Sequence, residues 1–215
     1  MRLSRDFYSR SAEVLAPNLL GKLLCRRLEG GIIRYRITET EAYVGEEDTA
    51  CHAHRGKTPR NAVMYGQAGT AYIYLCYGIH NLLNIVAAGE GEPEAVLIRG
   101  VEGFPGPGRL TKAMSVGRSL NGADLTVSEE LWLEDDGVIF AYEAAPRIGI
   151  DYASDIDRAR LWRFTAIYDY YSGEAPEKQS TRHMARPLLL TKSFSKKVND
   201  NIPGYNRSKH KKLFL

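Results

Sequence analysis

Two carboxylates and a tyrosine alternate in the segment Glu39-Thr40-Glu41-Ala42-Tyr43. Side chains alternate across a strand, so Glu39, Glu41 and Tyr43 share one face when the segment is extended. A carboxylate beside an aromatic ring in a partly dry pocket can act as a general base, because burial and neighbouring charges tune its pKa. A solvated acidic strand end has the same spacing, and from the residues alone that alternative stays open.

Arg99 follows the apolar run 95–98, which has the composition of a buried strand. An arginine at a strand end can pair with a carboxylate such as Glu41 or orient a water molecule. We expect such a pair to lower the pKa of the carboxyl and to keep it ionised. An unpaired surface cation is the alternative.

Two tyrosines precede the predicted hairpin turn Tyr77-Gly78-Ile79-His80, and a third lies in it. Tyr72 and Tyr74 alternate on one predicted strand, where aromatic rings usually pack against the neighbouring strand. Tyr77 falls at the tip, where there is little core to receive its ring. An aromatic side chain in such a place can insert between stacked bases.

A basic loop lies between these segments and contains Arg55, Lys57 and Arg60. Arginine and lysine in a turn-rich loop can contact phosphates, although a plain solvated loop is equally consistent with the pattern. His52 and His54 precede the loop and raise the question of a metal site. The sequence offers no second ligand pair at a suitable spacing, so we expect no metal and no cofactor.

Composition limits the class of protein. The chain has 215 residues, a net charge of +3 and 44% hydrophobic residues, which are ordinary values for one globular domain. Its longest apolar run, near Leu82–Ala88, falls well short of the ~20 residues that cross a bilayer. The first residues lack the apolar core of a signal peptide. We therefore expect a cytoplasmic protein that is neither secreted nor bound to a membrane.

Charge is distributed unevenly along the chain. Residues 178–215 hold 10 Lys or Arg and 1 Asp or Glu, whereas residues 1–177 hold 19 and 25. A basic tail suits a polyanion such as nucleic acid, and a solvated extension is the alternative. We place a domain over residues 1–173 and a basic extension over residues 174–215.

Hydrophobic periodicity and turn signals predict a mixed domain in which hairpins dominate over crossover connections, so a doubly wound parallel sheet is not expected. A long Gly-, Asp- and His-rich loop covers residues 45–61. Helices are predicted over residues 11–20, 109–115 and 155–163, and strands over 22–28, 32–43, 71–75, 82–87, 131–133 and 138–142.

Taken together, the segments resemble the alkyladenine DNA glycosylases, also called the 3-methyladenine DNA glycosylase family. The order and spacing agree from about Phe7 to Phe164, which is most of the chain. The matching motifs are Glu39–Tyr43, Glu47-Asp48, His52, Thr58–Asn61, Gly69–Gly78, Asn84-Ile85, Val96–Arg99, Gly106–Leu110, Pro146–Ile150 and Trp162–Phe164.

The resemblance implies an α+β fold, with a single domain that has a curved antiparallel sheet, flanking helices and a protruding β-hairpin. It implies a monofunctional enzyme without metal or cofactor that excises alkylated, and often deaminated, purines from double-stranded DNA in base-excision repair. We expect the protein to act as a monomer and, if bacterial, to be associated with the nucleoid. No role carries over beyond Phe164, where the match ends.

Residue roles follow from the same resemblance. Glu41 matches the glutamate that activates the attacking water, and Arg99 and the backbone carbonyl of Ile148 match groups that hold this water. The matches to the aromatic rings around the flipped base are Tyr43 and Tyr74, with His52 on the opposing wall.

Two further positions match family residues at the edge of the base site. Tyr77 matches the tyrosine that fills the vacated stack, and Asn84 matches the amide that screens purine substituents.

Two other functions remain open at this point. A non-catalytic nucleic-acid-binding protein would use the tyrosine hairpin as a stacking platform and would not need Glu41. A metal-dependent hydrolase would use His52 and His54 as ligands and would lose activity in a chelator.

Overall fold

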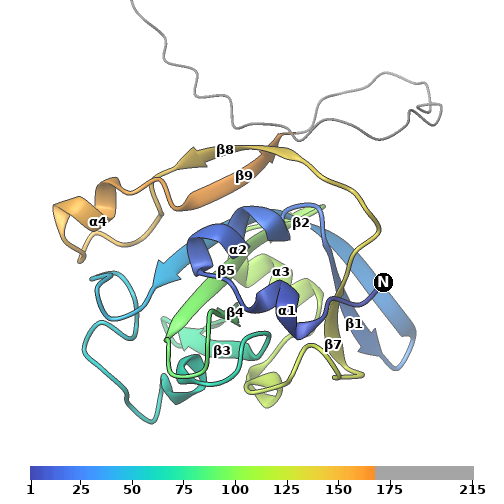
Figure 1. The fold of residues 1–215 in the computed structure, drawn as a ribbon. Coiled ribbons are helices and arrows are strands. Elements are labelled where there is room, and N and C mark those ends of the chain that lie inside the picture. Colours follow the sequence, from blue (N-terminus) through green and yellow to red (C-terminus); the bar gives the residue numbers. More distant parts are fainter. Residues whose placement is uncertain (168–215) are drawn as a thin grey trace, which may run out of the picture. The chain divides into compact units, whose positions relative to one another are not determined.

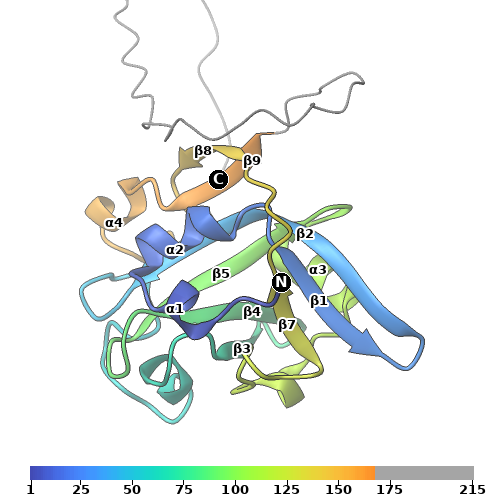
Figure 2. The same cartoon turned by 45° about the vertical axis from the view of Figure 1, so that its right-hand side comes forward.

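The computed structural model of the chain describes residues 1–167. The predicted boundary at residues 173 and 174 and the basic extension lie outside the described residues. Within the described part, nine strands join in one sheet, and every strand pairing is antiparallel. The predicted α+β class, with a single domain and a strongly curled antiparallel sheet, is confirmed (Figures 1 and 2).

The order of the main strands is β3-β4-β5-β2-β1-β7, while β6 pairs with β5, and β9 pairs with both β2 and β8. Consecutive strands pair in β1-β2, β3-β4, β4-β5 and β5-β6, as the turn signals predict, whereas the β2-β5, β1-β7 and β2-β9 pairings join strands that are distant in the sequence. The strands are β1 (Leu23–Leu28), β2 (Gly31–Val44), β3 (Ala71–Cys76), β4 (His80–Ala87), β5 (Glu94–Val101), β6 (Phe104–Pro105), β7 (Leu131–Glu134), β8 (Ala141–Ala145) and β9 (Arg163–Ile167).

Strand β2 is 14 residues long and connects the two ends of the sheet. Its first half pairs with β1, and its second half lies between β5 and β9. The register with β5 shifts on both sides of Glu39, first between Ile37 and Glu39 and then between Glu39 and Thr40. A bulge changes the direction of side chains on the bulged strand. The second shift places Arg99 opposite the Glu39–Thr40 step.

Short helices cover the sheet. Helix α2 (Ala12–Leu19) buries Ala12, Leu15, Ala16 and Leu19 against β2 and β5, and helix α3 (Pro107–Ala113) packs against β4 and β5 (Figure 1). The other helices in residues 1–167 are α1 (Arg5–Tyr8), α4 (Asp155–Ala159) and the 3-10 turns Ala62–Tyr65 and Arg118–Leu120. Among the described helices, none is long and apolar enough to cross a membrane.

Strands β3 and β4 form the predicted hairpin, with register Ala71↔Ile85 to Cys76↔His80. Tyr77 at the turn has φ 51° and is 89% exposed. A left-handed conformation is unfavourable for a residue with a side chain, and such conformations persist mainly at functional positions. The backbone conformation at Tyr77 therefore lowers the stability of the fold, and it presents the ring to solvent.

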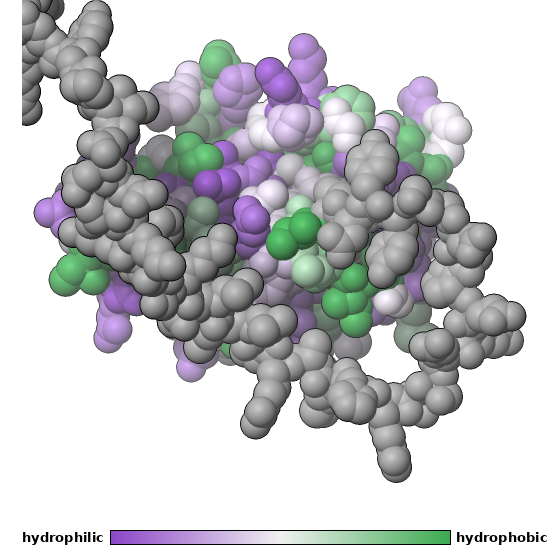
Figure 3. Space-filling model, turned by 90° about the horizontal axis from the view of Figure 1, so that it is seen from above, coloured by the Kyte–Doolittle hydropathy of each residue, from purple (hydrophilic) through white to green (hydrophobic). Residues whose placement is uncertain are grey.

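The strand predicted over residues 138–142 is placed incorrectly. Strand β8 begins at Ala141 and pairs with β9, which the sequence analysis did not predict, while β7 pairs with β1. The turn after β7 does not form a hairpin with β8. Instead, Asp135 accepts a hydrogen bond from Lys22, and Asp136 accepts one from Arg36. Where the described residues are visible on the face above β8 and β9, hydrophobic and hydrophilic side chains are interspersed (Figure 3).

Candidate active site

Glu41 lies where strand β2 is paired on both edges. It is opposite Leu97 of β5 and opposite Arg163 of β9, and its side chain is fully buried. Its backbone is therefore held by the sheet on both sides. A carboxylate in this position needs polar partners, because burying an unpaired charge is very unfavourable.

Three groups supply those partners. The Ile148 N–H donates to Oε1 of Glu41 at 2.9 Å, and the Tyr43 hydroxyl donates to Oε2 at 2.9 Å. Arg99 Nη1 lies 3.3 Å from Oε1. Tyr43, Arg99 and Ile148 all line one cavity of about 370 Å³, and the carboxylate lies directly behind them. The structure thus brings together four residues with roles implied by the resemblance. Glu41, Arg99 and Ile148 are the residues assigned to the attacking water, and Tyr43 is assigned to the flipped purine.

The pKa of Glu41 is raised above its ordinary value, in contrast to the lowering that the pairing with Arg99 predicts. Burial has the largest effect, and it outweighs the opposing effects of Arg99, the Ile148 N–H and the Tyr43 hydroxyl. A carboxylate with a raised pKa is a stronger base, while its hydrogen bonds still favour the ionised form. Burial, followed by the charge of Glu41, keeps the pKa of Tyr43 well above normal, so that the Tyr43 hydroxyl remains a donor.

Arg99 is shared between two carboxylates on the same face of β2. Its Nε donates to Oε1 of Glu39 at 3.3 Å, and Arg163 Nη1 donates to the same oxygen at 3.1 Å. The guanidinium of Arg99 is therefore charge-balanced and fixed at the cavity wall. Arg99 lies within β5 and not at its end as predicted, and the bulge described above explains how its side chain reaches this face.

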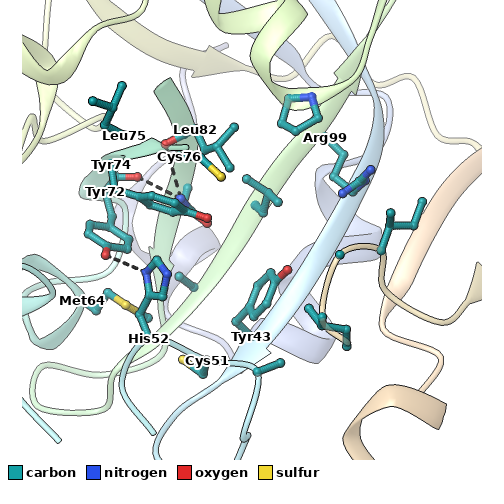
Figure 4. A pocket seen from close by; sticks show the side chains of 18 of the residues that line it. Tyr43, Cys51, His52, Met64, Tyr72, Tyr74, Leu75, Cys76, Leu82 and Arg99 are labelled. Atoms are coloured by element: carbon teal, nitrogen blue, oxygen red, sulfur yellow. Dashed lines mark hydrogen bonds between the residues drawn. The ribbon is translucent and has the colours of Figure 1, made fainter. Parts of the chain in front are cut away.

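The opposite wall of the cavity consists of three rings. His52 and Tyr74 pack edge to face with ring centroids 4.5 Å apart, and the Tyr72 hydroxyl is 2.9 Å from Nδ1 of His52. Figure 4 shows these rings on one side of the cavity and Tyr43 and Arg99 on the other. Loss of water around the His52 ring, and then the charge of Arg60, lower its pKa, which favours a neutral imidazole.

Asn84 forms part of the cavity lining between these walls. It lies on β4, opposite Tyr72 of β3 and Leu97 of β5, and its Nδ2 donates to the Tyr72 carbonyl at 3.1 Å. The amide is buried and fixed in orientation. The Asn84 side chain is therefore positioned to contact the polar edge of a planar ligand.

The three cations of the basic loop have different surroundings. Arg55, Lys57 and Arg60 are all exposed. Lys57 Nζ lies 5.3 Å from the ring centroid of Tyr65, and the Arg60 guanidinium lies 5.6 Å from the ring centroid of Tyr74. Arg60 also lines the cavity, which its predicted role as a phosphate contact did not indicate.

A buried ion pair that the sequence patterns did not predict lies behind Tyr43. Arg147 donates to both carboxylate oxygens of Asp48, at 2.5 and 2.8 Å, and to the carbonyl of Ala42 at 2.9 Å. Its guanidinium lies 4.7 Å from the ring centroid of Tyr43 and 5.0 Å from that of Trp162. Both partners belong to matching motifs, Glu47-Asp48 and Pro146–Ile150, but a separation of 99 residues hid the pair.

The two histidines considered as metal ligands have separate partners. His52 faces Tyr72, while His54 Nδ1 is 2.8 Å from the carbonyl of Glu46. Across residues 1–167, no three His, Cys, Asp or Glu side chains are grouped so that they could hold a metal ion.

The chain matches a family described as methylpurine-DNA glycosylase over residues 6–104 and 102–169. It therefore belongs to the methylpurine-DNA glycosylase family, and it is an enzyme that hydrolyses N-glycosyl bonds. The predicted resemblance is confirmed.

Relatives in curated collections carry a more specific name, "Putative 3-methyladenine DNA glycosylase". A protein from Methanocella arvoryzae is 48% identical over 182 residues, which cover 75% of this chain and 90% of that protein. One from Psychrobacter cryohalolentis is 42% identical over 193 residues, covering 76% and 90%, and one from Sodalis glossinidius is 43% identical over 172 residues, covering 77% and 96%.

Proposed function

We propose that the protein is a monofunctional DNA N-glycosylase of base-excision repair that removes alkylated, and also deaminated, purines from duplex DNA. The observation that carries the proposal is the buried Glu41 carboxylate, which is held by Tyr43, Arg99 and Ile148 at the wall of a ring-lined cavity. The cavity volume is within the range of small-molecule sites and suits one purine. The substrate is double-stranded DNA with a damaged purine, and the protein acts as a cytoplasmic monomer.

The target base must leave the duplex before its sugar can be reached. Extrusion costs a few kcal/mol, and less where damage has weakened the base pair. Tyr77, exposed at the hairpin turn and lining the mouth of the cavity, inserts into the gap and keeps it open. The extruded base then lies between the Tyr43 ring and the rings of Tyr74 and His52, with Asn84 at its edge.

Hydrolysis requires one water and one base. Within the described residues, Oε2 of Glu41 accepts a hydrogen bond from Tyr43 alone, so it can still accept one from water. As the N-glycosidic bond breaks, its electron pair leaves with the purine, and the sugar carbon becomes cationic. The water oxygen bonds to that carbon and its proton passes to Glu41, while Arg99 and the Ile148 carbonyl orient the water. The negative carboxylate also stabilises the developing positive charge on the sugar.

An excision assay tests the proposed function directly. Duplexes that carry hypoxanthine, ethenoadenine or 3-methyladenine are incubated with the protein in the presence of a chelator. We expect an alkali-labile site at the lesion and free base in solution. Tight binding to undamaged single strands without excision would favour the non-catalytic alternative, and loss of excision in the chelator would favour a metal-dependent enzyme.

Replacing Tyr77 by serine should weaken binding to a lesion-containing duplex about tenfold to a hundredfold, because the stacking of one base on an aromatic ring is lost. The rate of the chemical step at saturating enzyme should change less. Gel-shift affinity and single-turnover excision separate the two effects.

Ile79→Ser is the matched control, because Ile79 lies in the same turn and is 73% exposed. It should leave lesion affinity near that of the wild type. Equal affinities of the wild type and the Tyr77 variant would remove this ring from the extrusion step.

A further inference from the structure

Arg60 is a charged residue of the cavity lining to which the proposed mechanism assigns no role. It is exposed in the loop between β2 and β3, it lines the cavity, and its guanidinium lies over the Tyr74 ring. A guanidinium above a ring draws on the same π-electrons that would attract a cationic ligand. The ring that receives the extruded base is therefore already occupied, in part, by a cation.

The charge of Arg60 is not balanced by a carboxylate. Arg99 on the opposite wall pairs with Glu39 and Glu41, and Arg147 behind Tyr43 pairs with Asp48. By contrast, no Asp or Glu of residues 1–167 forms an ion pair with Arg60. The net charge of the wall on the Tyr74 side is therefore positive.

Neighbouring groups respond to this charge. Burial raises the pKa of Tyr72 to about 12, and Arg60 opposes that rise. The pKa of His52 is lowered by burial and then by Arg60. The charge thus acts on more than one group of the wall that faces the base.

We propose that Arg60 determines specificity by favouring neutral purine lesions, such as deaminated and etheno bases, over cationic N-alkylated ones. A cationic base stacked on Tyr74 meets an uncompensated like charge on the same wall, whereas a neutral base does not. The inference rests on the proposed function, and it alters the simple expectation that two tyrosine rings attract cationic purines. Cationic bases remain substrates, because their positive charge makes them good leaving groups.

The test compares two lesions in each variant. Excision is measured under single-turnover conditions, with the enzyme in excess over the DNA but below saturation, at pH 8, where His52 is neutral, on duplexes with 3-methyladenine and with hypoxanthine. We expect Arg60→Gln to raise the ratio of the 3-methyladenine rate to the hypoxanthine rate by about threefold to tenfold, a range typical of a partly solvated charge pair. Arg60→Lys, which keeps the charge, should leave the ratio within about twofold of the wild type on the same basis.

Arg55→Gln is the matched control. Arg55 is an exposed arginine of the same loop that lines a neighbouring cavity and not the cavity of Tyr74. Its removal should leave the ratio unchanged. If Arg60 only contacts phosphate, Arg60→Gln slows both lesions equally and reduces the salt dependence of binding, and the inference is overturned. A wild-type protein that excises neither base would instead overturn the proposed function.

Discussion

Replacing Glu41 by glutamine is expected to abolish base excision and, at neutral pH, to make the protein more stable. The rate should fall by at least about 10²–10⁴-fold, the usual contribution of a general base. The fold should survive, because each neighbour keeps a partner. The Ile148 N–H can donate to the amide oxygen, the Tyr43 hydroxyl can accept from the amide NH₂, and Arg99 retains Glu39.

The gain in stability follows from the raised pKa of Glu41. A carboxyl whose pKa is higher in the folded than in the unfolded state contributes stability below its unfolded pKa, and that contribution is lost as pH rises through its folded pKa. At neutral pH the wild type therefore carries a buried charge that opposes folding. Glutamine removes this charge, so the difference in melting temperature between variant and wild type should be largest near pH 7–8 and should shrink towards acidic pH.

Thermal unfolding at several pH values and single-turnover excision check the two parts of this prediction. Glu39→Gln is the control, because it alters a glutamate on the same face and leaves Glu41 in place. It should retain excision. Residual turnover at the wild-type rate in the Glu41 variant would remove this carboxylate from the mechanism, and a lower melting temperature at pH 7 would contradict the energetic interpretation.

Replacing Arg147 by methionine is expected to destabilise the protein by about 3–5 kcal/mol, the range for removing one partner of a buried ion pair. Both side chains are fully buried, so Asp48 would be left without its charge partner. The Tyr43 ring and the Ala42 carbonyl would also lose a contact. Denaturant unfolding measures the loss.

The double variant Asp48→Asn/Arg147→Met should recover part of this loss, because no uncompensated charge then remains. Arg160→Met serves as the surface control. Arg160 lies over Trp162 and pairs with Asp157, but it is itself exposed, so its loss should cost about 1 kcal/mol or less. An Arg147 variant as stable as the Arg160 variant would show that the buried pair adds little to stability.

Local patterns predicted the parts of the fold that depend on neighbouring residues. Alternation over residues 32–43 located β2, and the glycines between the strands predicted over 22–28 and 32–43 and at Gly78 located the turns of two hairpins. The placement of β8 failed because the sequence Asp135-Asp136-Gly137 between the two predicted strands has the composition of a short turn, whereas Asp135 binds Lys22, just before β1, and Asp136 binds Arg36 of β2. Strand β9 has only five residues, and its pairing with β2 depends on contacts that no local pattern contains.

The site shows the same division. Spacing on one strand correctly grouped Glu41 with Tyr43, and Tyr72 with Tyr74. The raised pKa of Glu41 could not be predicted, because burial is a property of the whole fold and here outweighs Arg99. Similarly, the bulge that directs Arg99 and the position of Arg60 over Tyr74 depend on strand register and loop conformation.

The double-sided pairing of β2 has a consequence for how the chain acquires its activity. Glu41 is flanked by a strand far downstream, as the contact between Glu39 and Arg163, 124 residues apart, illustrates. Contacts between such distant segments form slowly, because closing a large loop loses chain entropy before the contacts can stabilise the fold. A chain in which β9 has not docked leaves one edge of β2 unpaired beside Glu41, so we expect the carboxylate to be more hydrated and less basic there than in the complete sheet. Under the proposed function, full activity is therefore expected only once β9 has paired with β2.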